Sequence, residues 1–456
     1  MILKNLIYIF QREDYYIARF LKFSYSNFFW HRLQKRNKLK WTKKTISLFA
    51  LSFLLFLILF FLILASRKYF LFLGLYFSLP ILIVFSFLIL RPFDFYLKKK
   101  IVEKARKVLE DIKKRKEIIV IGISGSFGKT SQKEILAKIL ESKFKVLKIS
   151  GNINTELGVS EFILNHQSQI EEVGVFVVEM GAYKMGEIGK ICDLVKPQFS
   201  ILTGIGNCHL ERFGNLENLI KAKFELAEKT TGLAFLNIGN DVIANNFKNY
   251  NIKKSKLIDI KDVIKNIEHL DNFSGLRFEY NNFKLETKLL ATHNIDLIVL
   301  AISLAQELGI DMEAIKKSLS SVEIVKHRLE PIYNANTKIW VIDDSYNGNF
   351  SGIKSGLEVL NLAKGRKIVL TPGLVELGEE SKKVHTQIAQ IYRDNVDLVL
   401  LIDTKATKII KKNFVKNNFR NYKIYKSSKE AHDDLANILK TEDTIIFQND
   451  ISDNYL

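Results

Sequence analysis

The chain has 456 residues, of which 47% are hydrophobic and 26% are charged, and its formal net charge is +19. This composition excludes a disordered or collagen-like chain, the length favours two or three domains, and two cysteines exclude a disulfide framework and favour a reducing compartment. A charge of +19 is compatible with nucleic-acid binding, so the position of the charge along the chain decides whether that function is favoured.

The positive charge lies in the first quarter of the chain. Residues 1–117 contain 24 Lys and Arg against 7 Asp and Glu, whereas residues 118–456 contain 44 against 42. The same quarter holds two uncharged apolar runs, at residues 46–65 and 70–90. About 20 apolar residues cross a hydrocarbon core of roughly 30 Å. Soluble helices seldom lack a polar face over this length, so membrane spans are favoured over the alternative of two buried core helices.

The short linker at residues 66–69 predicts a hairpin whose two flanks lie on the same side of the membrane. Lys and Arg number 11 in residues 1–45 and 11 in residues 91–117, against 2 in the linker. The positive-inside rule then places both flanks, and the rest of the chain, in the cytosol at the cytoplasmic membrane. We expect a basic, aromatic cytosolic or interfacial segment at 1–45, a transmembrane hairpin at 46–90 and a basic linker at 91–117.

Aromatic rings alternate with Lys and Arg in residues 1–45. This mixture suits the lipid headgroup region, and an RNA-binding arm is the alternative. Because the charge surrounds the two spans, we expect membrane lipid as its partner and no nucleic acid.

From Ile118 onward, short β-branched runs alternate with segments of helical period, which predicts mostly parallel sheets covered by helices. The first strand runs into a glycine-rich loop and then a helix. Glycines let backbone N–H groups approach phosphate oxygens, and in such a loop Lys129 bridges nucleotide β- and γ-phosphates while Thr130 holds Mg²⁺. A plain glycine-rich strand–helix turn is the alternative. The candidate phosphate-binding residues are Gly125, Ser126, Gly128, Lys129, Thr130 and Ser131.

The spacing of Gly122, Gly125 and Gly128 before Lys129-Thr130 resembles the phosphate loop of the Mur ligases, ATP-dependent enzymes that form amide bonds in peptidoglycan precursor synthesis. The resemblance covers most of residues 118–390. Within the family the chain is similar to the MurF group, which joins D-Ala-D-Ala to a UDP-linked muramoyl tripeptide.

This resemblance implies the domain organisation of the chain. We expect an α/β fold with a P-loop parallel-sheet ATPase domain at residues 118–325 and a Rossmann-like C-terminal domain at residues 326–456. Two transmembrane helices precede these domains.

Candidate metal ligands follow the next strands. Glu179 ends an apolar strand, and ionised groups at strand ends in such sheets commonly face the ligand crevice. The resemblance implies that Glu179 and His209 bind Mg²⁺, and that a carbamylated lysine, Lys223 rather than Lys221, supports a second ion. Thr130 completes the expected metal set, and Lys129, His209 and Lys223 are the expected catalytic residues. The alternatives are a solvated strand end, a structural histidine and a solvated lysine face.

The resemblance also implies nucleotide and substrate contacts in the second half of the chain. Ala291 and His327 stand where the family has glycine, and Phe350 replaces a proline. The expected further nucleotide contacts are Asn294, Arg328, Asp343, Tyr346 and Asn347. The expected substrate contacts are Asn154, Thr155, Asn349 and Glu376.

The reaction implied is activation of a carboxylate by ATP, with Mg²⁺, as an acyl phosphate that an amine then attacks. The expected substrates are a muramoyl peptide and an amino acid or dipeptide such as D-Ala-D-Ala. Residues 371–373 and 447–450 depart from the MurF pattern, and residues 1–117 leave too little chain for the globular domain that grips uridine in soluble MurF proteins. Two alternatives stay open: a Mur-type ligase with a lipid-linked acceptor or a different amine, and a non-catalytic nucleotide-binding scaffold.

Overall fold

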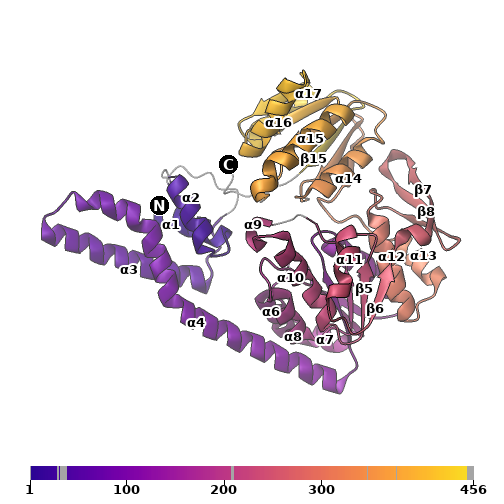
Figure 1. The fold of residues 1–456 in the computed structure, drawn as a ribbon, viewed down its shortest axis with the longest axis horizontal. Coiled ribbons are helices and arrows are strands. Elements are labelled where there is room, and N and C mark those ends of the chain that lie inside the picture. The colour runs from indigo at the N-terminus through magenta and orange to yellow at the C-terminus, as the bar shows by residue number, and fades with distance from the viewer. Residues whose placement is uncertain are drawn as a thin grey trace. The chain divides into compact units, whose positions relative to one another are not determined.

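The computed structural model describes residues 2–27, 30, 38–151, 153–206, 210–346, 348–375 and 377–448. The chain divides into two compact units, an N-terminal unit that ends at Ile101 and a larger unit that begins at Val102. Figure 1 shows the ribbon coloured along the sequence.

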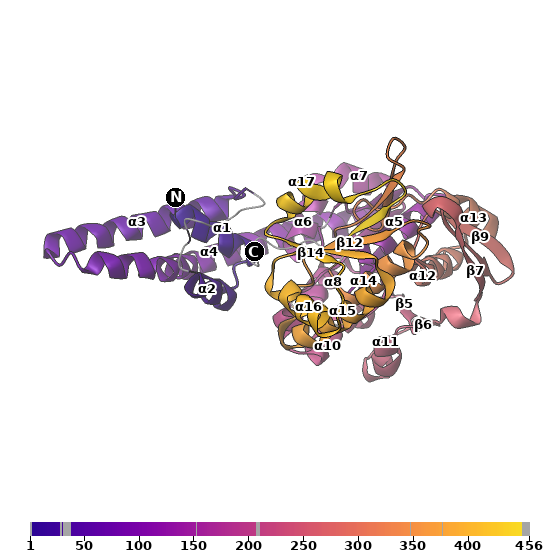
Figure 2. The same ribbon diagram turned by 90° about the horizontal axis from the view of Figure 1, so that it is seen from above.

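The N-terminal unit is helical. Its helices are α1 (Ile2–Arg12), α2 (Ile17–Ser26), α3 (Lys43–Ser66) and the first part of α4 (Leu71–Arg115). α3 and this part of α4 lie side by side as a hairpin in both views (Figures 1 and 2). Both helices are long and apolar enough to cross a membrane, and only 11% of the most apolar stretch of α3 is buried. Exposure of this kind is unlike a soluble core helix, whose apolar side chains are covered by protein.

The described part of residues 1–45 folds onto the hairpin. Side chains from α1, including Tyr8 and Phe10, are buried in one cluster with Leu48 of α3 and Ile83 of α4. Some aromatic residues of this segment are therefore buried, whereas Tyr16 and Trp41 are exposed.

The last part of α4 belongs to the larger unit. Val102, Ala105, Leu109 and Ile112 follow a helical spacing of three and four residues, and all four are buried in the core of that unit. Lys113 donates a hydrogen bond to the carbonyl of Val195 at 2.7 Å. The sequence predicted a basic linker over residues 91–117, whereas the structure has α4 through Arg115 with an apolar stripe packed on the following domain.

The first domain of the larger unit contains a six-stranded parallel sheet in the order β2-β3-β1-β4-β5-β6. Its strands are β1 (Ile119–Ser124), β2 (Val146–Lys148), β3 (Val175–Glu179), β4 (Phe199–Leu202), β5 (Leu233–Asn237) and β6 (Ser255–Ile258). Alternate residues face opposite layers, because Ile121 and Ile123 join one core cluster while Val120 joins another.

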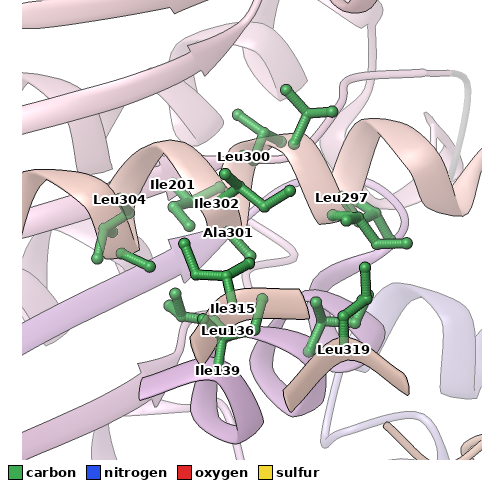
Figure 3. Packing of buried hydrophobic residues seen from close by; sticks show 14 of the residues in the cluster. Leu136, Ile139, Ile201, Leu297, Leu300, Ala301, Ile302, Leu304, Ile315 and Leu319 are labelled. Atoms are coloured by element: carbon green, nitrogen blue, oxygen red, sulfur yellow. The ribbon is translucent and has the colours of Figure 1, made fainter. Parts of the chain in front are cut away.

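Helices cover both faces of this sheet. Figure 3 shows one core, where Leu136 and Ile139 of α5 (Lys129–Leu140) pack with Leu304 of α12 (Asn294–Glu307) and Ile315 of α13 (Met312–Ser320). The other face carries α6 (Glu156–Asn165), α8 (Glu187–Val195) and the end of α4. The remaining elements are α7 (Gln167–Glu172), α9 (Leu210–Phe213), α10 (Leu216–Lys229), α11 (Asp241–Asn246) and the antiparallel sheet of β7 (Ile264–Leu270), β8 (Gly275–Tyr280) and β9 (Phe283–Thr287).

The second domain has a six-stranded sheet in the order β10-β11-β15-β12-β13-β14, in which β10 alone is antiparallel to its neighbour. The strands are β10 (Glu330–Asn334), β11 (Ile339–Asp344), β12 (Lys367–Thr371), β13 (Leu398–Ile402), β14 (Tyr422–Tyr425) and β15 (Thr444–Gln448). The helices are α14 (Phe350–Leu360), α15 (Ser381–Asn395), α16 (Lys405–Lys416) and α17 (Ser428–Ile438). The predicted fold class, parallel-sheet α/β domains preceded by two apolar helices, is confirmed.

Candidate active site

The loop between β1 and α5 has the backbone geometry of a phosphate loop. Gly128 precedes the first turn of α5 with φ +75°, a left-handed conformation that glycine adopts without strain. A Cβ atom on Gly125 would lie 2.1 Å from the Thr203 hydroxyl, so only glycine fits at that position. The Ser126 N–H donates to the carbonyl of Gly204 at 2.7 Å. Contacts with the end of β4 therefore fix the shape of the loop.

Three predicted residues meet at the start of α5. The Lys129 ammonium donates to the carbonyl of Gly125 at 2.9 Å. The Thr130 hydroxyl donates to the Glu179 carboxylate at 3.1 Å, and Glu179 is only 2% exposed at the end of β3. The buried Ser126 hydroxyl has no hydrogen-bond partner in the part of the chain that the structure describes. An ammonium, an unpartnered hydroxyl and a helix N-terminus around one loop are the groups that bind a phosphate.

The oxygen atoms beside this loop fit a hard divalent cation. Thr130 offers a hydroxyl and Glu179 a carboxylate, which are ligand types that Mg²⁺ accepts together with phosphate oxygens and water. Asn154 donates from its side-chain amide to the second Glu179 oxygen at 3.4 Å, so both oxygens of this carboxylate are oriented.

A first pocket opens on one side of the loop. Ser126, Lys129, Asn154 and Thr155 line it together with Lys223 of α10. Lys223 is 4% exposed. Lys221, by contrast, is half-exposed and pairs with Glu217 one turn earlier at 2.6 Å. Of the two lysines considered from the sequence, the structure brings only Lys223 to the pocket.

A cavity lies on the other side, between the two α/β domains. Gly128 and Ser131 of the first domain and Asn349 of the second line it, together with Asn294 and Arg328. Arg328 donates to the Thr130 hydroxyl at 3.3 Å, and its guanidinium lies 5.0 Å from the centre of the Tyr346 ring. Burial lowers the pKa of the Arg328 guanidinium, and the nearby Glu179 carboxylate opposes that shift. Arg328 therefore links the second domain to the phosphate loop.

Asp343 contacts His327, a residue that departs from the family pattern. His327 has φ +63°, which explains a glycine at this position in the family. Its ring Nδ1 lies 2.7 Å from the Asp343 carboxylate. Asp344, the next residue on β11, lines the cavity instead. Successive strand residues point to opposite faces of a sheet, so the side chains of Asp343 and Asp344 cannot both face the cavity.

We expect His327→Asn to reduce the pH dependence of stability. The hydrogen bond and charge of Asp343 raise the pKa of His327, so the stabilisation from the pair is complete below the unfolded histidine value of about 6.5 and is lost as pH rises through the raised value. Asparagine tolerates a left-handed backbone and does not titrate in this range. Thermal melting should show the variant about 2 °C below the wild type at pH 6, with the gap closing by pH 9. An equal gap at both pH values would contradict this account.

Other predicted residues have structural roles or lie outside the described residues. Thr155 caps α6 and Asn349 caps α14 through their side-chain oxygens. His209, Asn347 and Glu376 lie outside the described residues, so their expected roles stay predictions.

Some site residues escaped the sequence analysis. Asp344 lines the cavity between the domains, and Tyr183 and Glu187 line the first pocket. Lys133 is buried next to Glu179, one helical turn after Thr130. The sequence could have indicated Lys133, because it follows Thr130 by three residues on a helix and therefore lies on the same face.

Comparisons with known proteins place both domains in one family. The Mur ligase middle domain matches residues 123–305, and the Mur ligase glutamate ligase domain matches residues 327–448. UDP-N-acetylmuramoyl-tripeptide–D-alanyl-D-alanine ligase of Escherichia coli is 28% identical over 71% of this chain and 74% of its own length. The enzyme of that name from Borreliella burgdorferi is 32% identical over 62% of this chain and 61% of its own length.

A solved structure agrees with the fold. MurF ligase from Thermotoga maritima in complex with ADP has a TM-score of 0.65 and 22% identity, over 76% of this chain and 80% of that one. The two matched regions follow each other in order and together cover more than half of the chain. The family predicted from the phosphate loop is confirmed, and the chain belongs to the Mur ligases.

Proposed function

We propose that this protein is a membrane-anchored, ATP-dependent amide ligase of cell-wall precursor synthesis. It activates the carboxylate of a muramoyl peptide and joins it to an amino acid or dipeptide, with D-Ala-D-Ala the favoured amine. The observation that carries the proposal is the convergence of Lys129, Thr130, Glu179 and Arg328 on one loop, with Lys223 in the adjoining pocket. The E. coli and B. burgdorferi relatives, named for D-Ala-D-Ala ligation, support the choice of substrates.

The nucleotide occupies the cavity between the domains, with its phosphates on the loop. Asn294 and Asn349 line the part of the cavity that receives the nucleoside, and Arg328 reaches the phosphates beside Thr130. The ADP bound to the T. maritima MurF ligase supports a nucleotide of this type. A guanidinium suits this position because its planar donors match phosphate oxygens.

Thr130 and Glu179 would hold Mg²⁺, and His209 is a proposed further ligand outside the described residues. An ion held there would supply positive charge next to the phosphoryl oxygens. Lys223 is proposed to react with CO₂, losing a proton as its nitrogen forms a carbamate, and to support a second ion through the new oxygens. Its burial in the pocket that Lys129 also lines favours it over Lys221, whose ammonium pairs with Glu217.

The reaction has two steps. An oxygen of the substrate carboxylate attacks the γ-phosphorus, and the bond to ADP breaks as the acyl phosphate forms. The amine nitrogen then attacks the acyl carbon and loses a proton, and phosphate leaves with the oxygen that the carboxylate supplied. Lys129 stabilises the charge that develops on the phosphoryl oxygens, and Arg328 holds the second domain over the loop so that water is excluded.

The hairpin of α3 and α4 is proposed to anchor the enzyme in the cytoplasmic membrane, with both flanks and both α/β domains in the cytosol. The exposed apolar surface of α3 and the excess of Lys and Arg in the flanks support this placement. Carbonate extraction tests it, since release of the full chain into the soluble fraction would contradict two membrane spans.

A lipid-linked acceptor is the second candidate substrate. Helices α1 to α4 precede the family-matched region, and the apolar hairpin is proposed to anchor the enzyme in the membrane that holds lipid-linked precursors. The names of the E. coli and B. burgdorferi relatives specify a UDP-linked acceptor, and this favours a UDP-linked acceptor here.

ADP release by the detergent-solubilised full chain tests the proposal. We expect release to require both UDP-N-acetylmuramoyl-tripeptide and D-Ala-D-Ala, because an acyl phosphate turns over only when an amine consumes it. Release with a lipid-linked acceptor and D-Ala-D-Ala, but not with the UDP-linked acceptor and D-Ala-D-Ala, would select the second candidate. Absence of release with every acceptor and amine would favour a non-catalytic nucleotide-binding scaffold.

A further inference from the structure

A buried lysine lies directly behind the proposed metal site. Lys133 follows Thr130 by three residues on α5, and it is 1% exposed. Its ammonium lies 3.4 Å from the Glu179 oxygen that accepts the Thr130 hydrogen bond. Charged side chains are seldom buried this deeply without a partner, so the pair with Glu179 explains how both groups tolerate burial.

Two backbone carbonyls keep the Lys133 ammonium in place. It donates to the carbonyl of Ile149 at 2.8 Å and to that of Gly151 at 3.1 Å. Both bonds are independent of Glu179. The ammonium is therefore held near the carboxylate even when another cation takes over part of the charge of Glu179.

The same carbonyls connect Lys133 to the substrate side of the site. Gly151, which carries one of these carbonyls, precedes Asn154 by three residues. The side-chain amide of Asn154 donates to the other Glu179 oxygen at 3.4 Å. The backbone carbonyl of Asn154 accepts from the Gly181 N–H at 2.8 Å. Lys133 and Asn154 thus hold the Glu179 carboxylate from two sides.

From this arrangement we propose that Lys133 is a positioning residue that acts as the permanent internal counter-ion of Glu179. The inference rests on the proposed function, since it takes Glu179 as a ligand of the metal that accompanies the nucleotide. Lys133 balances the buried carboxylate when the site holds no metal. Once the metal binds, the fixed positive charge repels it, so Lys133 weakens metal–nucleotide binding and favours product release.

Removal of this charge has a consequence that a packing role does not share. Lys133→Met keeps the unbranched apolar stem and removes the ammonium. Because two unit charges a few ångströms apart interact strongly away from bulk water, the variant should bind the metal about tenfold more tightly or better. Its metal-free form should melt at a lower temperature than the wild type, because Glu179 is then buried without its counter-ion.

The test uses the full chain in detergent with saturating ADP, and free Mn²⁺ is measured by electron paramagnetic resonance. Lys138→Met is the matched control, because Lys138 lies on the same helix, exposed beside Glu141. We expect tighter Mn²⁺ binding in Lys133→Met and unchanged binding in Lys138→Met. Unchanged or weaker binding in Lys133→Met would overturn the inference. Failure of the wild type to bind Mn²⁺ with ADP would instead count against the proposed function.

A second variant keeps the inference testable if Lys133→Met folds poorly. Glu179→Gln combined with Lys133→Met removes both charges, so the double variant should melt at a higher temperature than Lys133→Met alone. Equal melting temperatures would show that lost packing, rather than an unpaired carboxylate, destabilises the single variant, and would overturn the counter-ion role.

Discussion

Replacement of Lys129 by alanine is expected to lower substrate-dependent ADP release by about a thousandfold or more. The Lys129 ammonium is held at the phosphate loop by the carbonyl of Gly125, and residues 125–128 between β1 and α5 contain no lysine. Preorganised charge at a developing phosphoryl transition state accounts for rate effects of at least about 10²–10³. Steady-state measurement of coupled ADP release by the detergent-solubilised full chain determines how far the rate falls.

Lys138→Ala is the control for this experiment, because it removes an exposed lysine from the same helix. It should release ADP at the wild-type rate. Substantial turnover by Lys129→Ala would contradict the assignment of residues 125–131 as the phosphate loop.

A fragment of residues 118–456 should be far less stable than a fragment of residues 102–456. The shorter fragment lacks the end of α4, whose Val102, Leu109 and Ile112 are buried in the first domain. Burial of each such side chain contributes about 1.5–3 kcal/mol, so their loss removes a large share of the roughly 5–15 kcal/mol that stabilises a typical domain. Urea unfolding followed by circular dichroism compares the two fragments.

Single substitutions separate packing from chain length in the longer fragment. Leu109→Ala should cost about 2–5 kcal/mol, because the cavity it leaves lies in a closed core. Lys107→Ala, at an exposed position on the same helix, should stay within about 0.5 kcal/mol of the parent. Equal unfolding midpoints for the fragments that begin at 102 and 118 would show that the end of α4 is dispensable.

Local patterns predicted the phosphate loop and the two apolar helices well. The loop depends on neighbouring residues, since Gly128 needs a left-handed backbone and Lys129 begins the following helix. The apolar helices were recognisable because a run of about 20 uncharged, apolar residues is typical of a membrane-spanning helix. Both features follow from chemistry within one short segment.

Features that depend on distant contacts were not predictable in the same way. The charge of residues 91–117 suggested a linker, because the four apolar residues of its stripe are outnumbered by lysine and arginine. Lys133 was unremarkable until β3 brought Glu179 to 3.4 Å from it. Asp344 lines the cavity whereas the predicted Asp343 contacts His327, and this depends on which face of β11 each side chain occupies, which no short pattern reveals.

The origin of the oxygen in released phosphate tests the central claim most directly. UDP-N-acetylmuramoyl-tripeptide carrying ¹⁸O in its reacting carboxylate is incubated with the full chain, ATP, Mg²⁺ and D-Ala-D-Ala, and the phosphate is examined by mass spectrometry. An acyl phosphate requires one ¹⁸O in each phosphate released, and release only when the amine is present. Phosphate without ¹⁸O would mean that water, and not the carboxylate, attacks ATP, and would contradict ligase activity.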